Sequence, residues 1–360
     1  MKKTALYNIH VGLNAKITSF GGYLMPVQYS SVKKEHLTVR NNLGVFDVSH
    51  MGEFFISGDN AINLLQYICS NDISKIKIGK AQYNYFPNHK GGIIDDLIVY
   101  RLEENKFMLV VNASNIEKDW DWITINNKNF NAEIVDRSNE ISLLAIQGPK
   151  SIEAMQSLTK FKLDSLPYYS QTTTIFAGCK NVIVATTGYT GSGGIEIYFN
   201  QKDSEKIWNS VIEAGKPFKI EPIGLAARDT LRIEMGYCLY GNEINENTSP
   251  VAAGLGWISK PEKKCVNHED IFLQISEGTN KKLIGFIMDE KAIPRSGYQI
   301  VNKEKNIIGK VTSGTQSPSL VKGIGLGYVE KSYSNLNTQI GIIIRNKICY
   351  ARVIKIPFIK

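Results

Sequence analysis

Apolar residues recur along this chain at two different spacings. At helical spacing they predict helices over Lys34–Asn42, Gly58–Cys69 and Ile223–Met235. Several other segments alternate apolar and polar residues with the two-residue period of strands, and strands are also predicted over Tyr83–Phe86 and Ile93–Tyr100. Because the two kinds of segment are interspersed, we expect an α+β fold.

The C-terminal part of the sequence has a different pattern of apolar and turn-forming residues. From about Lys281, short β-rich runs alternate with turn residues, and helical patterns are nearly absent. Residues 281–360 are therefore expected to form a separate small barrel or sandwich.

Two adjacent carboxylates, Asp95 and Asp96, interrupt the predicted strand Ile93–Tyr100. Residues 87–92 before it are rich in turn formers and favour a hairpin with the preceding strand. Successive strand side chains point to opposite faces, so only one acid can enter a given pocket. A carboxylate among aliphatic side chains is costly to bury without a partner, which makes at least one a functional candidate. The pattern is also compatible with two solvated acids that border the turn.

A glycine-rich cluster over Thr187–Tyr198 is the second candidate. Its glycines resemble a phosphate-binding loop, but it has neither the Gly-Lys-Ser/Thr ending of a P-loop nor the G-x-G-x-x-G order of a dinucleotide-binding turn. Glu196 lies between Ile195 and Ile197, so on a strand it would point to the face opposite both. A tight turn with an exposed glutamate is the simpler interpretation.

The predicted helix over Ile223–Met235 carries two arginines one turn apart, Arg228 and Arg232. A guanidinium on such a stripe can bind a carboxylate through two hydrogen bonds. Arg232 has a local partner in Asp229, three residues earlier, whereas Arg228 must find its partner elsewhere.

Charge limits the possible partners. The chain has 360 residues and a formal net charge of +8, from 42 basic and 34 acidic side chains. The basic residues are spread without a run of five or six, so we expect no nucleic-acid binding. An anionic small molecule, an acidic protein or a merely solvated surface would each account for the excess.

The cysteines and the hydropathy of the chain bear on metal binding and on the cellular compartment of the protein. The five cysteines are widely spaced, and Cys265 with His268 lacks the second pair of ligands that a zinc site needs, so we expect no metal and no disulfide framework. No apolar run is long enough to cross a membrane, and the first residues lack the apolar core of a signal peptide. A cytoplasmic protein is expected.

Further motifs accompany these clusters in a definite order: Phe46–Met51, Ile146–Pro149, Cys238–Glu243 and Thr312–Ser319. The ordered set resembles the T-protein of the glycine cleavage system, the tetrahydrofolate-dependent aminomethyltransferase, over essentially the whole chain. The resemblance implies two interleaved α+β subdomains around a folate channel, followed by a C-terminal β-barrel, in a cloverleaf-like arrangement of three parts. It implies a folate-binding region over 1–280, with subdomain A at about 1–52 and 137–280 and subdomain B at about 53–136, and a barrel over 281–360.

The resemblance also implies the reaction. The aminomethyl group on the dihydrolipoyl arm of the lipoylated H-protein passes to tetrahydrofolate, the co-substrate, giving 5,10-methylenetetrahydrofolate and ammonia. Neither a metal nor a membrane takes part. The catalytic acid of the family is the second Asp of its Gly-Gly-x-x-Asp-Asp motif, which falls on Asp96. The folate contacts of the family fall on Met51, Tyr83, Asn112, Tyr189, Glu196, Arg228, Tyr237 and Trp257.

Two related activities are alternatives. The folate-binding iron–sulfur assembly and repair branch of the superfamily has a lysine before its cysteine motif, which Gly236–Glu243 lacks. Folate-dependent demethylase domains are usually fused to a flavin oxidase, and this chain has no dinucleotide fingerprint. The complete Gly91–Asp96 motif favours aminomethyl transfer. Ser192 stands where the family usually has an acid, so the contact made at that position is left open.

Overall fold

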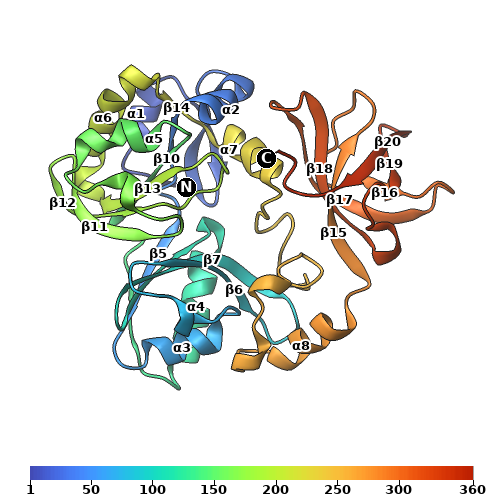
Figure 1. Ribbon diagram of the computed structural model, residues 1–360, viewed down its shortest axis with the longest axis horizontal. Helices are drawn as coiled ribbons and strands as arrows, with labels where there is room; N and C mark the ends of the chain where they lie inside the picture. Colours follow the sequence, from blue (N-terminus) through green and yellow to red (C-terminus); the bar gives the residue numbers. More distant parts are fainter. Residues whose placement is uncertain (360) are drawn as a thin grey trace. The chain divides into compact units, whose positions relative to one another are not determined.

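A computed structural model describes residues 1–359 and divides into two compact units. The first unit contains Met1–Ile68, Asp72–Asn84 and Asp96–Arg228. The second contains Cys69–Asn71, Tyr85–Asp95 and the chain from Asp229 onward. Figure 1 shows the elements of both units in the colours of the sequence.

The first unit is built partly around a six-stranded sheet. In spatial order its strands are β11 (Gln171–Phe176), β12 (Cys179–Ala185), β13 (Gly194–Asn200), β10 (Ile141–Gln147), β4 (Gly44–Asp47) and β14 (Glu221–Pro222). Every residue of β10 is buried, as expected for a central strand that is covered on both faces. Helices α5 (Ser151–Met155) and α6 (Ser204–Gly215) bury Met155 and Trp208 in the same apolar core as the strands.

A five-stranded sheet carries the paired acids. Its order is β6 (Ala81–Pro87), β7 (Ile93–Glu103), β8 (Lys106–Val111), β5 (Gly52–Ser57) and β9 (Glu133–Asp136). The predicted strands and the hairpin that joins them are confirmed, because β6 and β7 are neighbours in this sheet. Helices α3 (Ala61–Ile68) and α4 (Ile116–Asn127) accompany the sheet in Figure 1, and Trp120 of α4 packs against Phe54 with ring centroids 5.2 Å apart.

The hairpin turn is held by its own residues. The Oδ1 atom of Asn88 accepts hydrogen bonds from the backbone N–H groups of Lys90, at 2.8 Å, and Gly92, at 2.9 Å. A Cβ atom on Gly92 would lie only 1.8 Å from the carbonyl oxygen of Glu246, so no larger residue fits without moving the backbone. The turn chemistry therefore sets where β7, and with it the paired acids, begins.

The remaining elements of the first unit are a small sheet and three helices. The sheet has the order β1 (Lys2–Lys3), β3 (Tyr23–Gln28) and β2 (Lys16–Phe20). The helices are α1 (Tyr7–Gly12), α2 (Val32–Asn41) and α7 (Leu225–Met235), and the last continues into the second unit. The predicted helices thus correspond to α2, α3 and α7.

The second unit contains helix α8 (His268–Glu277) and a closed six-stranded barrel. Around the barrel the strands are β15 (Lys281–Met288), β18 (Lys322–Glu330), β17 (Ile307–Ser317), β16 (Gln299–Val301), β19 (Gln339–Ile344) and β20 (Lys347–Ile354). Closure pairs the strand edges that an open sheet would expose. Phe286, Ile342 and Val353 are among the side chains that fill its core. The expected barrel is confirmed, and the α+β fold class with it.

A buried contact between a histidine and a carboxylate in the first unit links α1 to β4. The Nε2 atom of His10 lies 2.9 Å from Oδ2 of Asp47, and both side chains are fully buried. The same oxygen accepts a hydrogen bond from the Thr4 hydroxyl at 2.7 Å, and the backbone N–H of Ser49 donates to Oδ1 at 3.0 Å. Burial alone would raise the pKa of Asp47, but the contacts with His10, Ser49 and Thr4 hold it below its ordinary value.

Asp47→Asn is expected to lower the free energy of unfolding at pH 7 by about 2–3 kcal/mol, because bonds to a charged acceptor are lost. A carboxyl with a lowered folded-state pKa stabilises fully above its unfolded pKa, and this stabilisation disappears as the pH falls below about 4. The difference between the two proteins should therefore shrink in acid. Urea unfolding at pH 7 and below pH 4 measures it. Glu140→Gln, in the exposed pair with Arg137, is the control, with an expected change of at most about 1 kcal/mol.

Candidate functional site

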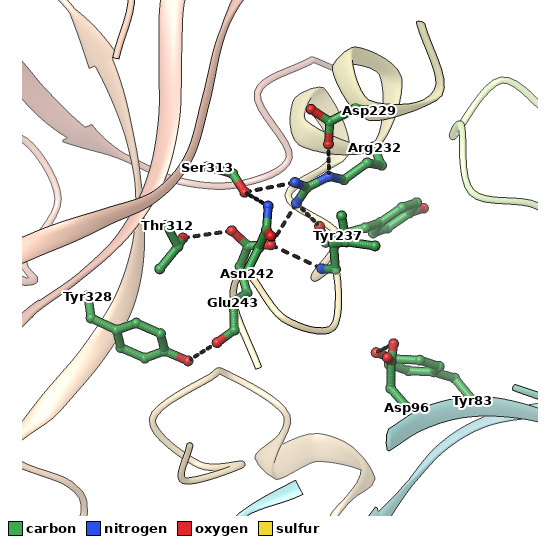
Figure 2. Close-up of polar contacts among 11 residues, drawn as sticks. Tyr83, Asp96, Asp229, Arg232, Tyr237, Asn242, Glu243, Thr312, Ser313 and Tyr328 are labelled. Atoms are coloured by element: carbon green, nitrogen blue, oxygen red, sulfur yellow. Dashed lines mark hydrogen bonds and ion pairs between the residues drawn. The ribbon is translucent and has the colours of Figure 1, made fainter. Parts of the chain in front are cut away.

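Asp96 lies on β7 with both carboxylate oxygens oriented by neighbours. The hydroxyl of Tyr83 donates to Oδ2 at 2.8 Å (Figure 2), and Nδ2 of Asn112 donates to Oδ1 at 2.9 Å. The same amide nitrogen also lies 3.1 Å from the backbone carbonyl of Asp96. Three of the residues predicted from the resemblance are thus in direct contact. The two donors hold the carboxylate of Asp96 in one orientation, so its negative charge is preorganised.

The two adjacent acids have different environments. Asp95 is fully buried, whereas Asp96 is only half-buried. The alternation of side chains on a strand requires this difference of faces. The interpretation of both acids as solvated turn residues is wrong, because neither is exposed.

Glu196 lies on β13, between Ala145 of β10 and Ala185 of β12 in the sheet register. The side chain is half-buried, and its Oε2 atom accepts a hydrogen bond from the Thr187 hydroxyl at 2.5 Å. Burial raises the pKa of the Glu196 carboxyl above its ordinary value, although Thr187 and the positive charge of Arg228 act in the opposite direction. The interpretation of Glu196 as an exposed turn residue is therefore wrong.

Tyr100 links the two strands that carry these acids, and sequence reasoning missed it. It lies four residues after Asp96 on β7, so both side chains leave the strand on the same face. The hydroxyl of Tyr100 is 2.7 Å from the Thr187 hydroxyl and 3.0 Å from that of Tyr198. The only signal in the sequence was the two-residue period of the strand.

Arg228 and Tyr189 form a cation–π pair. The guanidinium carbon of Arg228 lies 4.4 Å from the ring centroid of Tyr189. A guanidinium held on an aromatic face keeps the orientation that two-point recognition of a carboxylate requires. Arg228 thus has a contact outside its own helix, with Tyr189 in the glycine-rich turn, and its carboxylate partner stays a prediction.

Gln147, in the motif Ile146–Pro149, holds the turn that carries Tyr189. Its Nε2 atom donates to the carbonyl oxygens of Thr187 at 3.1 Å and Ile195 at 3.3 Å, and its Oε1 accepts from the Thr190 hydroxyl at 2.9 Å. Gln147 is almost fully buried. Sequence reasoning gave this motif no role, because three partners so far away in the chain become neighbours only in the sheet.

Arg40 holds the same turn from helix α2. Its Nη1 atom donates to the carbonyl oxygen of Thr190 and, at 2.7 Å, to the hydroxyl of Ser192. At the position where the family usually has an acid, this chain has the hydroxyl of Ser192, which accepts a hydrogen bond from Arg40. The contact left open by the sequence is a hydrogen bond inside the first unit.

Met51 follows a buried histidine in the loop before β5. Loss of solvent, and then the positive charge of Arg228, lower the pKa of His50 to about 3. The imidazole is therefore neutral at physiological pH. It packs edge-on against Phe20, with ring centroids 5.4 Å apart. His50 was not singled out from the sequence, although it lies inside the motif Phe46–Met51.

Tyr237 and Trp257 lie in the second unit, whereas the other seven predicted residues lie in the first. The backbone carbonyl of Tyr237 accepts a hydrogen bond from Nη1 of Arg232 at 3.0 Å, and its side chain is half-buried. Trp257 lies in a 3₁₀ turn, Gly256–Ile258, and 65% of its surface is exposed. An indole so exposed in this unit can pack against a planar group.

Three further expectations concern absences. Among residues 1–359, no group of three or more His, Cys, Asp or Glu side chains is arranged to hold a metal ion. All five cysteines are free thiols. Within the same range, no helix has the length and apolarity needed to span a membrane.

Known proteins share this fold and sequence. Residues 6–263 match the GCVT N-terminal domain, and residues 281–360 match the glycine cleavage T-protein C-terminal barrel domain. The chain is 58% identical over 360 residues to an aminomethyltransferase of Flavobacterium psychrophilum and 51% identical over 362 residues to one of Phocaeicola vulgatus, with 100% of each chain covered. The crystal structure of glycine cleavage system aminomethyltransferase T from Bartonella henselae is 31% identical, with a TM-score of 0.93 over 99% of this chain and 98% of that one.

An α+β region with three sheets and a closed barrel, together with these matches, defines a group-transfer enzyme. The chain belongs to the glycine cleavage T-protein family, and its activity is that of an aminomethyltransferase. The main prediction is thus confirmed over the iron–sulfur assembly alternative. The roles of the single site residues stay predictions.

Proposed function

We propose that this aminomethyltransferase takes the aminomethyl group from the dihydrolipoyl arm of a lipoylated H-protein and passes its methylene to tetrahydrofolate, with release of ammonia. One observation carries the proposal: a half-buried carboxylate, Asp96, has both oxygens oriented by the predicted folate contacts Tyr83 and Asn112. Residues implied by the family for one folate site thus meet at the residue implied for catalysis.

Asp96 is proposed to act on developing positive charge. Transfer of a methylene from an S–CH2–NH3+ group passes through an iminium-like state, which a fixed carboxylate stabilises. The same carboxylate can accept or hold a proton near the attacking nitrogen of the folate. Tyr83 and Asn112 keep its oxygens in place, so little reorganisation is needed during the reaction.

Folate recognition is assigned to four side chains. Glu196 offers a carboxylate to the donor edge of the pterin, and Tyr189 and Trp257 offer aromatic faces to its ring. Arg228, held against Tyr189, is proposed to bind a carboxylate of the glutamate tail. Met51 and Tyr237 are assigned as further folate contacts on the family resemblance alone. No resident metal takes part in this scheme, since tetrahydrofolate is a co-substrate.

The net charge of +8 suits this pair of partners. Folate with its glutamate tail is anionic, and a positively charged surface raises the rate of encounter with anionic ligands and acidic proteins. A cytoplasmic location, with no nucleic acid or membrane as partner, stays a prediction.

A coupled assay tests the proposal. Purified chain, aminomethylated H-protein and tetrahydrofolate are mixed, and ammonia and 5,10-methylenetetrahydrofolate are measured together. Both products are expected in equal amounts and only when all three components are present. Ammonia release that does not depend on tetrahydrofolate would contradict the proposed acceptor.

Gln147→Leu is expected to raise the Kd for tetrahydrofolate by about tenfold, because the turn that carries Tyr189 loses three hydrogen bonds. The free energy of unfolding should also fall, by about 2–4 kcal/mol. Gln156→Leu is the matched control, since Gln156 also makes three hydrogen bonds with backbone groups, in a different turn. Calorimetric binding and urea unfolding of both variants separate the effects: an equal Kd in the two would remove Gln147 from the site's support.

A further inference from the structure

A buried ion pair lies at the centre of a hydrogen-bond network in the second unit (Figure 2). The Nη1 atom of Arg232, on α7, is 2.7 Å from Oε2 of Glu243, and the two side chains are 1% and 0% exposed. The predicted local partner Asp229 also binds the guanidinium, with 2.8 Å between Nε and Oδ1. Arg232 therefore has a second and more deeply buried carboxylate that the sequence did not indicate.

This pair holds the backbone of the loop that follows α7 by hydrogen bonds. Nη1 of Arg232 donates to the backbone carbonyl of Tyr237 at 3.0 Å, and Oε2 of Glu243 accepts from the backbone N–H of Leu239 at 3.0 Å. The backbone is thus held on both sides of Cys238. These bonds act together with the one that the backbone N–H of Tyr237 donates to the carbonyl of Arg232 at 3.0 Å, so Arg232 holds Tyr237 through both its backbone and its side chain.

Barrel strands β17 and β18 complete the network. The Thr312 hydroxyl donates to Oε1 of Glu243 at 2.6 Å, and the Ser313 hydroxyl accepts from Nη2 of Arg232 at 2.7 Å. The hydroxyl of Tyr328 donates to the Glu243 carbonyl at 2.9 Å. Each remaining polar atom of the pair thereby finds a partner on the barrel.

The backbone of β17 is shaped for this contact. Consecutive side chains of a regular strand point to opposite faces, yet Thr312 and Ser313 both reach the Arg232–Glu243 pair. The pairing of β17 with β18 shifts register between Val311 and Ser313, so Thr312 is the extra residue of a bulge. A bulge re-aims a side chain in this way at the cost of a ladder bond.

Stability alone is a poor reason for such a network. A buried ion pair roughly repays its own desolvation, and apolar side chains of similar volume are often as stable. What the pair adds is a defined geometry, because every bond has one donor, one acceptor and one direction.

We infer that Arg232 and Glu243 are positioning residues, through which strands β17 and β18 fix the loop at Tyr237 and so set the affinity for tetrahydrofolate. The inference rests on the proposed function, in which Tyr237 contacts the folate. The barrel then contributes to substrate binding without a side chain of its own in contact with the ligand.

Thr312 and Tyr328 allow a test with conservative changes. Thr312→Val keeps the shape and removes the hydroxyl, whereas Thr312→Ser keeps the hydroxyl. Tyr328→Phe has a matched control in Tyr333→Phe, which also removes one barrel hydrogen bond, between Tyr333 and Asn302. Thr312→Val and Tyr328→Phe are expected to raise KM for tetrahydrofolate about three- to tenfold, the range for one lost hydrogen bond, with kcat little changed. Thr312→Ser and Tyr333→Phe should retain the original KM.

Tyr237→Ala distinguishes a failure of the inferred positioning role from a failure of the proposed contact between Tyr237 and the folate. If Tyr237→Ala weakens folate binding but Thr312→Val and Tyr328→Phe do not, the inference is overturned while the proposed contact stands. If Tyr237→Ala leaves the Kd for tetrahydrofolate unchanged, the proposed contact fails, and the inference fails with it. A rise in KM that is equal in Tyr328→Phe and Tyr333→Phe would show a general loss of barrel stability and would also overturn it.

Discussion

Asp96→Asn is expected to lower the rate of aminomethyl transfer by about a hundredfold or more and to leave the Kd for tetrahydrofolate within a few fold. The amide keeps the size of the carboxylate and one acceptor oxygen, but it replaces the other oxygen by an NH2 donor and removes the charge. The charge matters in the transition state, where the methylene is iminium-like, and much less in the ground-state complex. Asn112 can still donate to the remaining oxygen, and the Tyr83 hydroxyl can accept from the new NH2 group, so the local structure should survive.

Single-turnover kinetics with aminomethylated H-protein, together with calorimetric folate binding, measure the two quantities separately. Asp95→Asn serves as the control, because Asp95 is the adjacent acid on the opposite face of β7. It is fully buried, so its replacement should lower the free energy of unfolding while the folded fraction keeps its rate. Unchanged turnover of Asp96→Asn would remove Asp96 from the reaction.

Arg228→Ala is expected to weaken tetrahydrofolate binding by about 2–4 kcal/mol, the cost of removing one partner of a buried charge pair. The variant loses the guanidinium proposed to bind the glutamate tail and the cation–π contact that fixes Tyr189. Calorimetry at pH 7 measures the loss. A folate that lacks the glutamate tail should show a smaller loss of affinity, because the charge partner of Arg228 is then absent from the ligand and only the effects through Tyr189 and Glu196 remain.

The same variant should alter the pH dependence of binding. The positive charge of Arg228 helps to lower the pKa of Glu196, so its removal lets that pKa rise further. Glu196 would then be protonated at higher pH and would lose the negative charge and one of the two acceptor oxygens that it offers to the pterin. The acidic limb of the binding profile is expected to move upward in pH. Arg137→Ala, which removes a cation–π contact with Phe55 instead, should change neither the Kd nor the profile.

Local patterns were sufficient for much of the fold. The turn residues 87–92 specify a tight connection whatever surrounds them, and the structure has β6 and β7 on either side of it. The change to short β-rich runs at about Lys281 coincides with the start of the first barrel strand, β15. Helix α8 was not predicted, because its exposed Phe272 and Leu273 break the apolar stripe by which a surface helix is recognised.

The candidate site was only partly predictable. The pleat of a strand requires Asp95 and Asp96 to face opposite sides, but it does not indicate which of the two is buried. The structure makes that choice, since Asp95 is the buried acid. Glu196 was ambiguous in the sequence for a related reason: its environment depends on Thr187 and Arg228, which reach it only in the folded sheet.

The sequence by itself determined the residue types of the site, the hairpin, the barrel and the family, because these depend on order and short spacing along the chain. Only the tertiary structure decided which groups meet: Gln147 with the turn at Tyr189, and Arg232 with Glu243. The physical reason is that burial and hydrogen bonding depend on distances in space, and folding makes neighbours of groups that lie far apart in the chain. A buried carboxyl group stays charged and oriented only when its neighbours are in place, as Asp47 does.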